Sequence, residues 1–211
     1  DLIWCDISDG EHVDYIFKKI KPTKVFNFAA ESHVDNSIKD VTPFIKTNII
    51  GTTNLLSSSV GVGVEKFHHI STDEVYGPAP VGHDHKEGEP HRPSNPYSAS
   101  KSAQESIAYS YWRTYNVPVT ITNTMNNFGE RQHPEKYVPM VIKKIMSGEV
   151  IDIHSKPNED KSWTIGSRVW LHARNHADAI QHILDNIDVI WYEDGESTPD
   201  IQRFNVAGEQ E

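Results

Sequence analysis

Short apolar segments alternate with longer amphipathic segments along the chain. Brief apolar runs bounded by turn residues predict buried strands, and apolar positions three or four residues apart predict helices. The expected strands are residues 2–7, 24–30, 66–72, 117–124, 150–154 and 203–208. The expected helices are residues 9–20, 42–60, 97–115, 134–149 and 172–187. We interpret the polar segments 78–96 and 155–168 as surface loops.

Strands that alternate with helices are typical of an α/β fold, a doubly wound parallel sheet with helices on both faces. In such sheets, ligands bind beyond the carboxyl ends of the strands. Polar or small residues follow three of the expected strands, in "AAESHVD" (29–35), "STDEVYG" (71–77) and "NTMNNFGE" (123–130). We therefore expect these three segments to lie together and to line a site.

The composition excludes several classes of protein. The 211 residues carry 20 Lys and Arg against 30 Asp and Glu, a formal net charge of −10. Without a basic stripe, nucleic acid is not an expected partner. The single cysteine, Cys5, excludes a disulfide framework and favours a reducing, cytoplasmic setting. No apolar run approaches the length of a transmembrane helix, so we expect no membrane partner.

The histidines offer weak metal-like patterns. The chain has 12 of them, and only "HDH" (83–85) and the pair His172 and His176 have a ligand-like spacing. Neither pattern has a cysteine partner, which structural zinc sites commonly include. We therefore expect structural or surface roles for these histidines, and no metal site.

One spacing indicates proton-transfer chemistry. Tyr97 and Lys101 are four residues apart in an expected helix, so they lie on one face. A nearby ammonium lowers the pKa of a phenol, which makes such a tyrosine a candidate general base. This pattern alone is weak, but Thr72, Asp73 and Glu74 at the end of an expected strand strengthen it.

Plainer interpretations of these residues remain open. Thr72 and Asp73 are residue types that form strand-to-loop turns through bonds to their own backbone. Glu74 could be a solvated acid. We interpret Tyr76 and Gly77 as residues that shape the loop.

Several segments together resemble a known family. They are "AAESHVD", "TNIIGTTNLL", "STDEVYG", "PYSASK", "NNFGERQHPEKYVP" and "FNVAG". In this order they resemble the extended short-chain dehydrogenase/reductases, and most of all the nucleotide-sugar 4,6-dehydratases of the dTDP-glucose type. The resemblance reaches from residue 1 to about residue 208. It implies a Rossmann-like NAD-binding domain at 1–125 and 173–190, and a partial substrate-binding region at 126–172 and 191–211.

The resemblance also implies a mechanism. Tyr97 would take the proton of the sugar 4-hydroxyl, which Thr72 holds, while a hydride leaves C4 for NAD+. Lys101 would lower the pKa of Tyr97 and bind the nicotinamide ribose. Glu74 would then take the C5 proton, Asp73 would protonate the departing 6-hydroxyl, and the hydride would return to C6. The pair Asp73–Glu74 favours dehydration of dTDP-glucose or UDP-glucose over 4-epimerisation or decarboxylation.

Further residues have implied binding roles. The cofactor would contact Asp6, Ile7, Ala29, Ala30, Ser32, Asn48 and Ser71, together with Tyr97 and Lys101. The nucleotide sugar would contact Ser32, Thr72, Asn126, Glu135, Lys136, Arg168 and Asn205. For Ala29 and Ala30, tight packing is an equal alternative, and Arg168 could be a surface residue.

The chain also departs from the family pattern. It has no glycine-rich turn for the cofactor pyrophosphate, so we expect an N-terminally truncated chain that binds NAD poorly. The segment "SRVWLHARNHADAI" (167–180) differs from the family's usual residues, which leaves the base and the sugar open. An inactive fragment is therefore an alternative to a working enzyme. The family commonly dimerises through two long helices, here near 42–60 and 97–116. Residues 107–115 could form that face or belong to the core.

Overall fold

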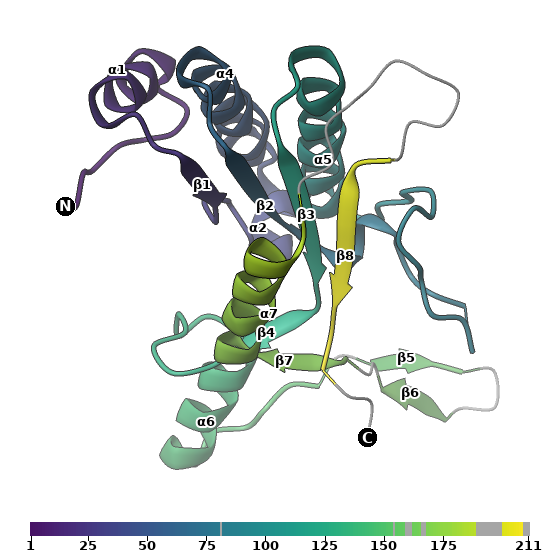
Figure 1. Ribbon diagram of the computed structural model, residues 1–211. Coiled ribbons are helices and arrows are strands. Elements are labelled where there is room, and N and C mark those ends of the chain that lie inside the picture. The colour runs from purple at the N-terminus through teal and green to yellow at the C-terminus, as the bar shows by residue number, and fades with distance from the viewer. Residues whose placement is uncertain (81, 154, 159–161, 166–167, 189–199, 209–211) are drawn as a thin grey trace.

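A computed structural model describes the chain except residues 81, 154, 159–161, 166–167, 189–199 and 209–211 (Figure 1). The helices are α1 (Gly10–Ile20), α2 (Val34–Lys39), α3 (Thr42–Phe44), η1 (Ile45–Gly51), α4 (Thr52–Val62), η2 (Asp73–Val75), α5 (Pro96–Tyr115), α6 (Tyr137–Ser147) and α7 (Ala173–Asn186). The strands are β1 (Lys24–Asn27), β2 (Lys66–Thr72), β3 (Val119–Thr124), β4 (Asn126–Phe128), β5 (Ser155–Pro157), β6 (Trp163–Ile165), β7 (Trp170–His172) and β8 (Gln202–Val206).

The main sheet is parallel and has the strand order β1-β2-β3-β8. Successive side chains of a strand point to opposite faces, and each face of this sheet is covered by helices. Phe67 and Ile121 pack with residues of α1, α4 and α5 in the main apolar core. Helix α7 lies on the other face (Figure 1), and its His176 is close to His68. The doubly wound, Rossmann-like α/β fold is thus confirmed.

Helix α5 begins at a complete capping box. The Asn95 side chain accepts a hydrogen bond from Ser98 N, the Ser98 hydroxyl pairs with the Asn95 backbone, and Pro96 occupies the first turn. The helix ends at Asn116, which has a left-handed backbone with φ of 52°. The capping residues therefore fix the start of the helix only one residue before Tyr97.

The long helix expected over residues 42–60 forms as three consecutive pieces. A π-helical segment, η1, joins α3 to α4, and such segments often occur at functional sites. Gly51 is the last residue of η1, and the Ile7 side chain packs directly against it. A Cβ atom on residue 51 would lie 2.5 Å from Ile7 Cδ1, so only glycine fits at this position without a shift of Ile7. This close packing fixes the N-terminal segment against the helix.

Some expected elements differ from the structure. Residues 1–6 form no strand, since they pair with none of the described strands and leave Leu2 and Trp4 exposed. Residues 150–153 also form no strand, and residue 154 lies outside the described part. The interpretation of 155–168 as a loop was wrong where β5 and β6 pair as an antiparallel hairpin. Because the segment is polar, its sequence lacks the apolar runs from which strands were predicted. The pairing of β5 with β6 uses backbone hydrogen bonds and does not require a buried apolar face.

The expected division into two regions stays a prediction, and the strand pairing bears on one of its bounds. Strands β4 and β7 pair with each other outside the main sheet. Strand β8, however, was expected in the substrate-binding region and instead pairs in parallel with β3. This pairing satisfies backbone groups along β3 that would otherwise need another partner. Among the described residues, no helix has both the length and the apolar character needed to cross a bilayer.

Candidate active site

The ends of three parallel strands meet at one edge of the main sheet. Asn27, the last residue of β1, is in register with His69, and Thr72 at the end of β2 is in register with Thr124 of β3. The segments that follow these strands therefore start from the same edge. This confirms the expectation that they lie together.

Thr72 organises the acidic turn. Its hydroxyl accepts a hydrogen bond from Glu74 N at 3.3 Å and donates to Asp73 Oδ1 at 3.1 Å. These bonds cap the short helix η2, so the local turn interpretation of Thr72 and Asp73 is also correct. These bonds hold the Asp73 carboxylate and the Glu74 backbone in place beside the strand end.

Asn95 links the acidic turn to helix α5. Its Nδ2 donates to Glu74 Oε2 at 3.0 Å, while its Oδ1 accepts from Ser98 N at 2.8 Å. Glu74 is therefore held against the first turn of the helix that carries Tyr97. The contact between Asn95 and Glu74 joins positions 21 residues apart and has no signal in the sequence.

Tyr97 joins this cluster. Its ring lies edge-on to Phe44 with centroids 6.4 Å apart, and its hydroxyl forms a hydrogen bond with Thr72. Burial raises the pKa of the phenol strongly, the negative charges of Glu74 and Asp73 raise it further, and the bond to Thr72 lowers it. Tyr97, Thr72, Asp73 and Glu74 thus interact as one group, which we call the acidic tyrosine cluster.

Lys101, one turn after Tyr97 in α5, is buried. Its Nζ donates to the Ile70 carbonyl oxygen at 2.7 Å. Burial lowers the pKa of Lys101 to about 7, opposed by the charge of Glu105. Ile70 therefore holds the amine beneath the end of β2. The effect of Lys101 on the pKa of Tyr97 stays a prediction.

The pKa of Asp73 is also raised. Burial has the largest effect, and the negative charge of Glu74 adds to it, whereas the bond from Thr72 and the charge of Arg168 oppose it. A higher pKa favours a carboxyl group that can donate a proton. Arg168 itself is exposed, and its contact with a substrate stays a prediction.

The proposed cofactor residues fall into two sets. Asp6 is exposed, and its Oδ1 accepts from Ser8 N and Ser8 Oγ, while Lys46 bonds to Oδ2. These bonds, led by the one from Ser8 N, lower the pKa of Asp6. Ala29 is exposed and Ala30 partly exposed after β1, and Ala29 N donates to Asn27 Oδ1. The small side chains leave the backbone open to a ligand.

The second set is held within the protein. The buried Asn48 amide bonds the backbone N and O of Glu31 and the hydroxyl of Ser100. Ser71 donates to Glu105 Oε1. Asn48 and Ser71 therefore position the surrounding loop and helix in this structure, and their contact with a cofactor stays a prediction.

The expected substrate residues are partly brought together. Lys136 Nζ donates to Ser32 O at 3.1 Å and to Ser32 Oγ at 3.3 Å, across 104 positions of sequence. Glu135 is exposed and lies beside His133. Asn126 starts β4, paired with Trp170. Lys136 and Ser32 thus form one polar patch at the strand ends.

Asn205 is engaged by other residues of the chain. Its Oδ1 accepts from the Tyr76 hydroxyl at 3.0 Å, and its Nδ2 donates to the His85 carbonyl oxygen at 3.1 Å. Its backbone N donates to Glu87 Oε1 at 2.8 Å. The structure therefore uses Asn205 to hold the loop before α5, and its contact with a substrate stays a prediction.

Glu105 is the centre of a buried network that the sequence analysis missed. Its carboxylate accepts from Ser71, from Asn123 Nδ2 at 2.7 Å and from Arg203 Nε at 2.9 Å. His91 Nε2 lies 3.4 Å away. The position of Glu105 four residues after Lys101, on the same helix face, was a signal that could have identified it.

Comparisons with known proteins agree with this arrangement. The family model described as GDP-mannose 4,6 dehydratase matches residues 1–205. The chain is 42% identical over 160 residues to the low-salt glycan biosynthesis protein Agl12 of Haloferax volcanii, covering 75% of this chain and 50% of that protein. It is 40% identical over 168 residues to the dTDP-glucose 4,6-dehydratase of Haemophilus influenzae, with the same coverage of 75% and 50%.

The chain is also similar in structure to a solved dTDP-glucose 4,6-dehydratase. The crystal structure of DesIV, a dTDP-glucose 4,6-dehydratase from Streptomyces venezuelae with NAD and TYD bound, matches with a TM-score of 0.79 and 32% identity. The match covers 95% of this chain and 55% of DesIV. The chain spans about half the length of the curated relatives it matches. Since the family model covers almost the whole chain, the chain belongs to the GDP-mannose 4,6 dehydratase family of extended short-chain dehydrogenase/reductases.

Proposed function

We propose that the chain carries the catalytic segment of an NAD-dependent nucleotide-sugar 4,6-dehydratase. Its substrate would be dTDP-glucose or UDP-glucose, and its product the 4-keto-6-deoxy sugar nucleotide. The observation that supports this most is the acidic tyrosine cluster: Tyr97, Thr72, Asp73 and Glu74 interact at the carboxyl ends of parallel strands. Relatives named dTDP-glucose 4,6-dehydratase support the same reaction.

The cofactor proposal is supported by residues at the sheet edge. Ala29 and Ala30 present small side chains, Asp6 presents an exposed carboxylate, and Lys101 brings an amine beneath the strand end. These residues fit the adenine and nicotinamide sides of NAD, whereas these 211 residues contain no glycine-rich turn for its pyrophosphate. When bound, NAD+ would supply a hydride acceptor and a positive charge near Tyr97.

The chain's own residues would handle the protons. Tyr97 would take the proton of the 4-hydroxyl, with Thr72 holding that oxygen. Because burial and two acids raise the pKa of Tyr97, proton transfer requires positive charge near the phenol, and Lys101 would contribute part of it. Asp73, whose pKa is raised, suits the role of acid toward the 6-hydroxyl. Glu74 is held by Asn95 through Oε2, which leaves Oε1 to take the C5 proton.

The test uses the full-length natural protein with NAD+ and a mixture of nucleotide sugars, with products identified by mass spectrometry. We expect one hexose nucleotide to lose one water. Glu74→Gln should lower kcat by about 10²–10⁴-fold, because a general base contributes that much. Loss of carbon dioxide instead of water would indicate a decarboxylase, and unchanged turnover in Glu74→Gln would rule out its role in elimination.

We also propose a cytoplasmic homodimer formed through η1, α4 and α5. The single cysteine, Cys5, is free, which supports a reducing compartment. Ile45, Ile50, Val60 and Tyr115 are exposed apolar side chains on these helices. Ala108 and Trp112 of the same segment are buried in the core, so residues 107–115 contribute to the core as well as to the surface.

A further inference from the structure

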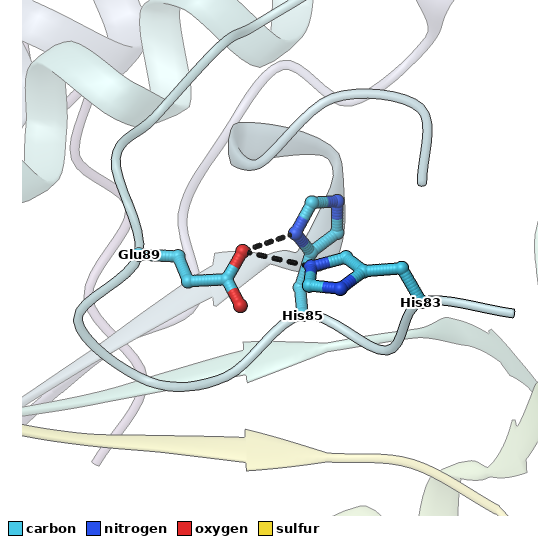
Figure 2. A group of neighbouring side chains, drawn as sticks. All are labelled: His83, His85 and Glu89. Carbon is cyan, nitrogen blue, oxygen red and sulfur yellow. Dashed lines mark hydrogen bonds and ion pairs between the residues drawn. The ribbon is translucent and has the colours of Figure 1, made fainter. Parts of the chain in front are cut away.

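The loop between η2 and α5, residues 78–95, brings three metal-ligand side chains together (Figure 2). His83 Nε2 lies 3.1 Å from Glu89 Oε2, and His85 Nδ1 lies 2.7 Å from the same oxygen. The three ligand atoms lie within 4.8 Å of one another. We call this group the His83–His85–Glu89 triad.

The local backbone explains how the triad forms. His83 and His85 are two positions apart, a spacing that puts side chains on one side of an extended segment. Glu89 is brought back to them by a turn in which its backbone N donates to Lys86 O at 3.2 Å. Gly88 has φ of 85°, a conformation that favours glycine, and Lys86 N donates to Glu89 Oε1 at 3.0 Å. The turn therefore aims the second carboxylate oxygen at the two rings.

The spacing suits a small divalent ion. Nitrogen and oxygen ligands at about 2.0–2.2 Å from a tetrahedral ion lie about 3.3–3.6 Å apart. The separations from Glu89 Oε2, 3.1 and 2.7 Å, are shorter than this, and all three ligand atoms lie within 4.8 Å of one another, so shifts of side chains within the loop bring the group to that spacing. His83 is exposed and His85 and Glu89 are partly exposed, which leaves a path for an ion.

We propose that His83, His85 and Glu89 bind one divalent transition-metal ion of the zinc type, with water completing the coordination. Two imidazoles and one carboxylate match the ligands that such ions prefer. From the sequence, structural or surface roles and no metal site were expected for "HDH", because the pattern has no cysteine partner. The turn at Gly88 supplies that ligand from six positions beyond His83.

The position of the triad indicates a structural role. The His85 ring stacks on Tyr76 with centroids 5.3 Å apart, and the His85 carbonyl oxygen accepts from Asn205 of β8. The loop that carries the triad joins η2, which holds Asp73 and Glu74, to α5, which holds Tyr97. A bound ion would cross-link this loop and restrain the distance between the two halves of the acidic tyrosine cluster.

The test is zinc binding by the purified protein without a histidine tag, measured by isothermal titration calorimetry after treatment with a chelator. Elemental analysis gives the stoichiometry, and the visible absorption of added Co²⁺ reports a four-coordinate site. We expect one saturable equivalent of Zn²⁺. Glu89→Gln and His83→Ala should each weaken it by at least about tenfold, since even indirect partners of a metal contribute tenfold or more.

Two controls separate this site from general binding by surface histidines. Asp84→Asn changes the exposed acid between the two histidines, and His133→Ala removes another exposed histidine that lies beside an acid. Both should leave the affinity unchanged, and circular dichroism should show that every variant is folded. The proposal is overturned if Zn²⁺ shows no saturable binding, or if Glu89→Gln and His83→Ala bind it as tightly as the two controls.

Discussion

At the scale of single residues, Asn95 has two functions that a substitution can separate. Its Oδ1 caps α5 and its Nδ2 holds Glu74. Asn95→Ser keeps a capping oxygen but is too short to hold Glu74. We expect kcat of the full-length enzyme to fall by about tenfold to a hundredfold, because a misplaced group loses its alignment. KM and the urea midpoint should change little.

The variant to compare with Asn95→Ser is Asn95→Ala, which loses both the helix cap and the bond to Glu74. Its free energy of unfolding should fall by about 1 kcal/mol, the usual contribution of a helix cap. If Asn95→Ser retained full turnover, the contact with Glu74 would have no positioning role.

Lys101 makes a separate prediction for the dependence of stability on pH. An unfolded lysine binds a proton below its ordinary pKa of about 10.4, whereas the folded chain protonates Lys101 only below about 7. Between these values the unfolded state binds more protons, so this group makes the fold more stable as the pH rises. Below about pH 7 both states bind this proton, and the full destabilisation that comes from burying a charged Lys101 is present.

The Lys101→Met variant should lack this contribution. We expect the wild-type free energy of unfolding to rise relative to that of the variant between about pH 7 and 9.5. Urea unfolding at several pH values measures this difference. A difference that stays constant over the range would mean that Lys101 keeps an ordinary pKa in the folded chain.

At the scale of elements, two glycines near the ends of α4 test how the N-terminal segment packs. Gly51, immediately before α4, has Ile7 where its Cβ would be, at 2.5 Å, whereas Gly61 has no atom within 4 Å of that position. Gly51→Ala should therefore destabilise the fold by about 1–3 kcal/mol, the cost of overpacking. Gly61→Ala should stabilise it by up to about 1 kcal/mol, because alanine is the better helix former.

Thermal or urea unfolding of both variants provides the measurement. The double variant Gly51→Ala with Ile7→Ala should recover part of the lost stability, because it removes the clashing side chain. A stabilising Gly51→Ala variant would show that residues 1–8 do not pack on the helix in solution.

At the scale of the whole molecule, the proposed dimer face can be tested by one substitution and its control. Ile50 in η1 has a residue exposure of 46%, and Ile145 in α6 has 62%. Ile50→Glu should shift the full-length protein from dimer to monomer in sedimentation analysis, because burying an unpaired carboxylate is costly. Ile145→Glu should leave the mass unchanged. A wild-type protein that is monomeric at all concentrations would rule out the dimer.

The sequence by itself determined the α/β class, the main-sheet strands with the helices between them, and the expectation of a site at their carboxyl ends. It did so because hydrophobic periodicity and the spacing of Tyr97 and Lys101 are local properties. The segments around Thr72 and Tyr97 also determined the family resemblance, which the family comparison confirmed.

Only the tertiary structure decided which residues contact one another across the sequence. The pairing of β8 with β3, the link between Asn95 and Glu74, and the network around Glu105 join positions that have no periodic relation. The amine of Lys101 bonds the Ile70 carbonyl oxygen, a partner 31 positions earlier in the chain that the sequence pattern does not indicate. Glu89 reaches two histidines through a turn at Gly88, since a hydrogen-bonded loop, and not a spacing rule, sets where its carboxylate points.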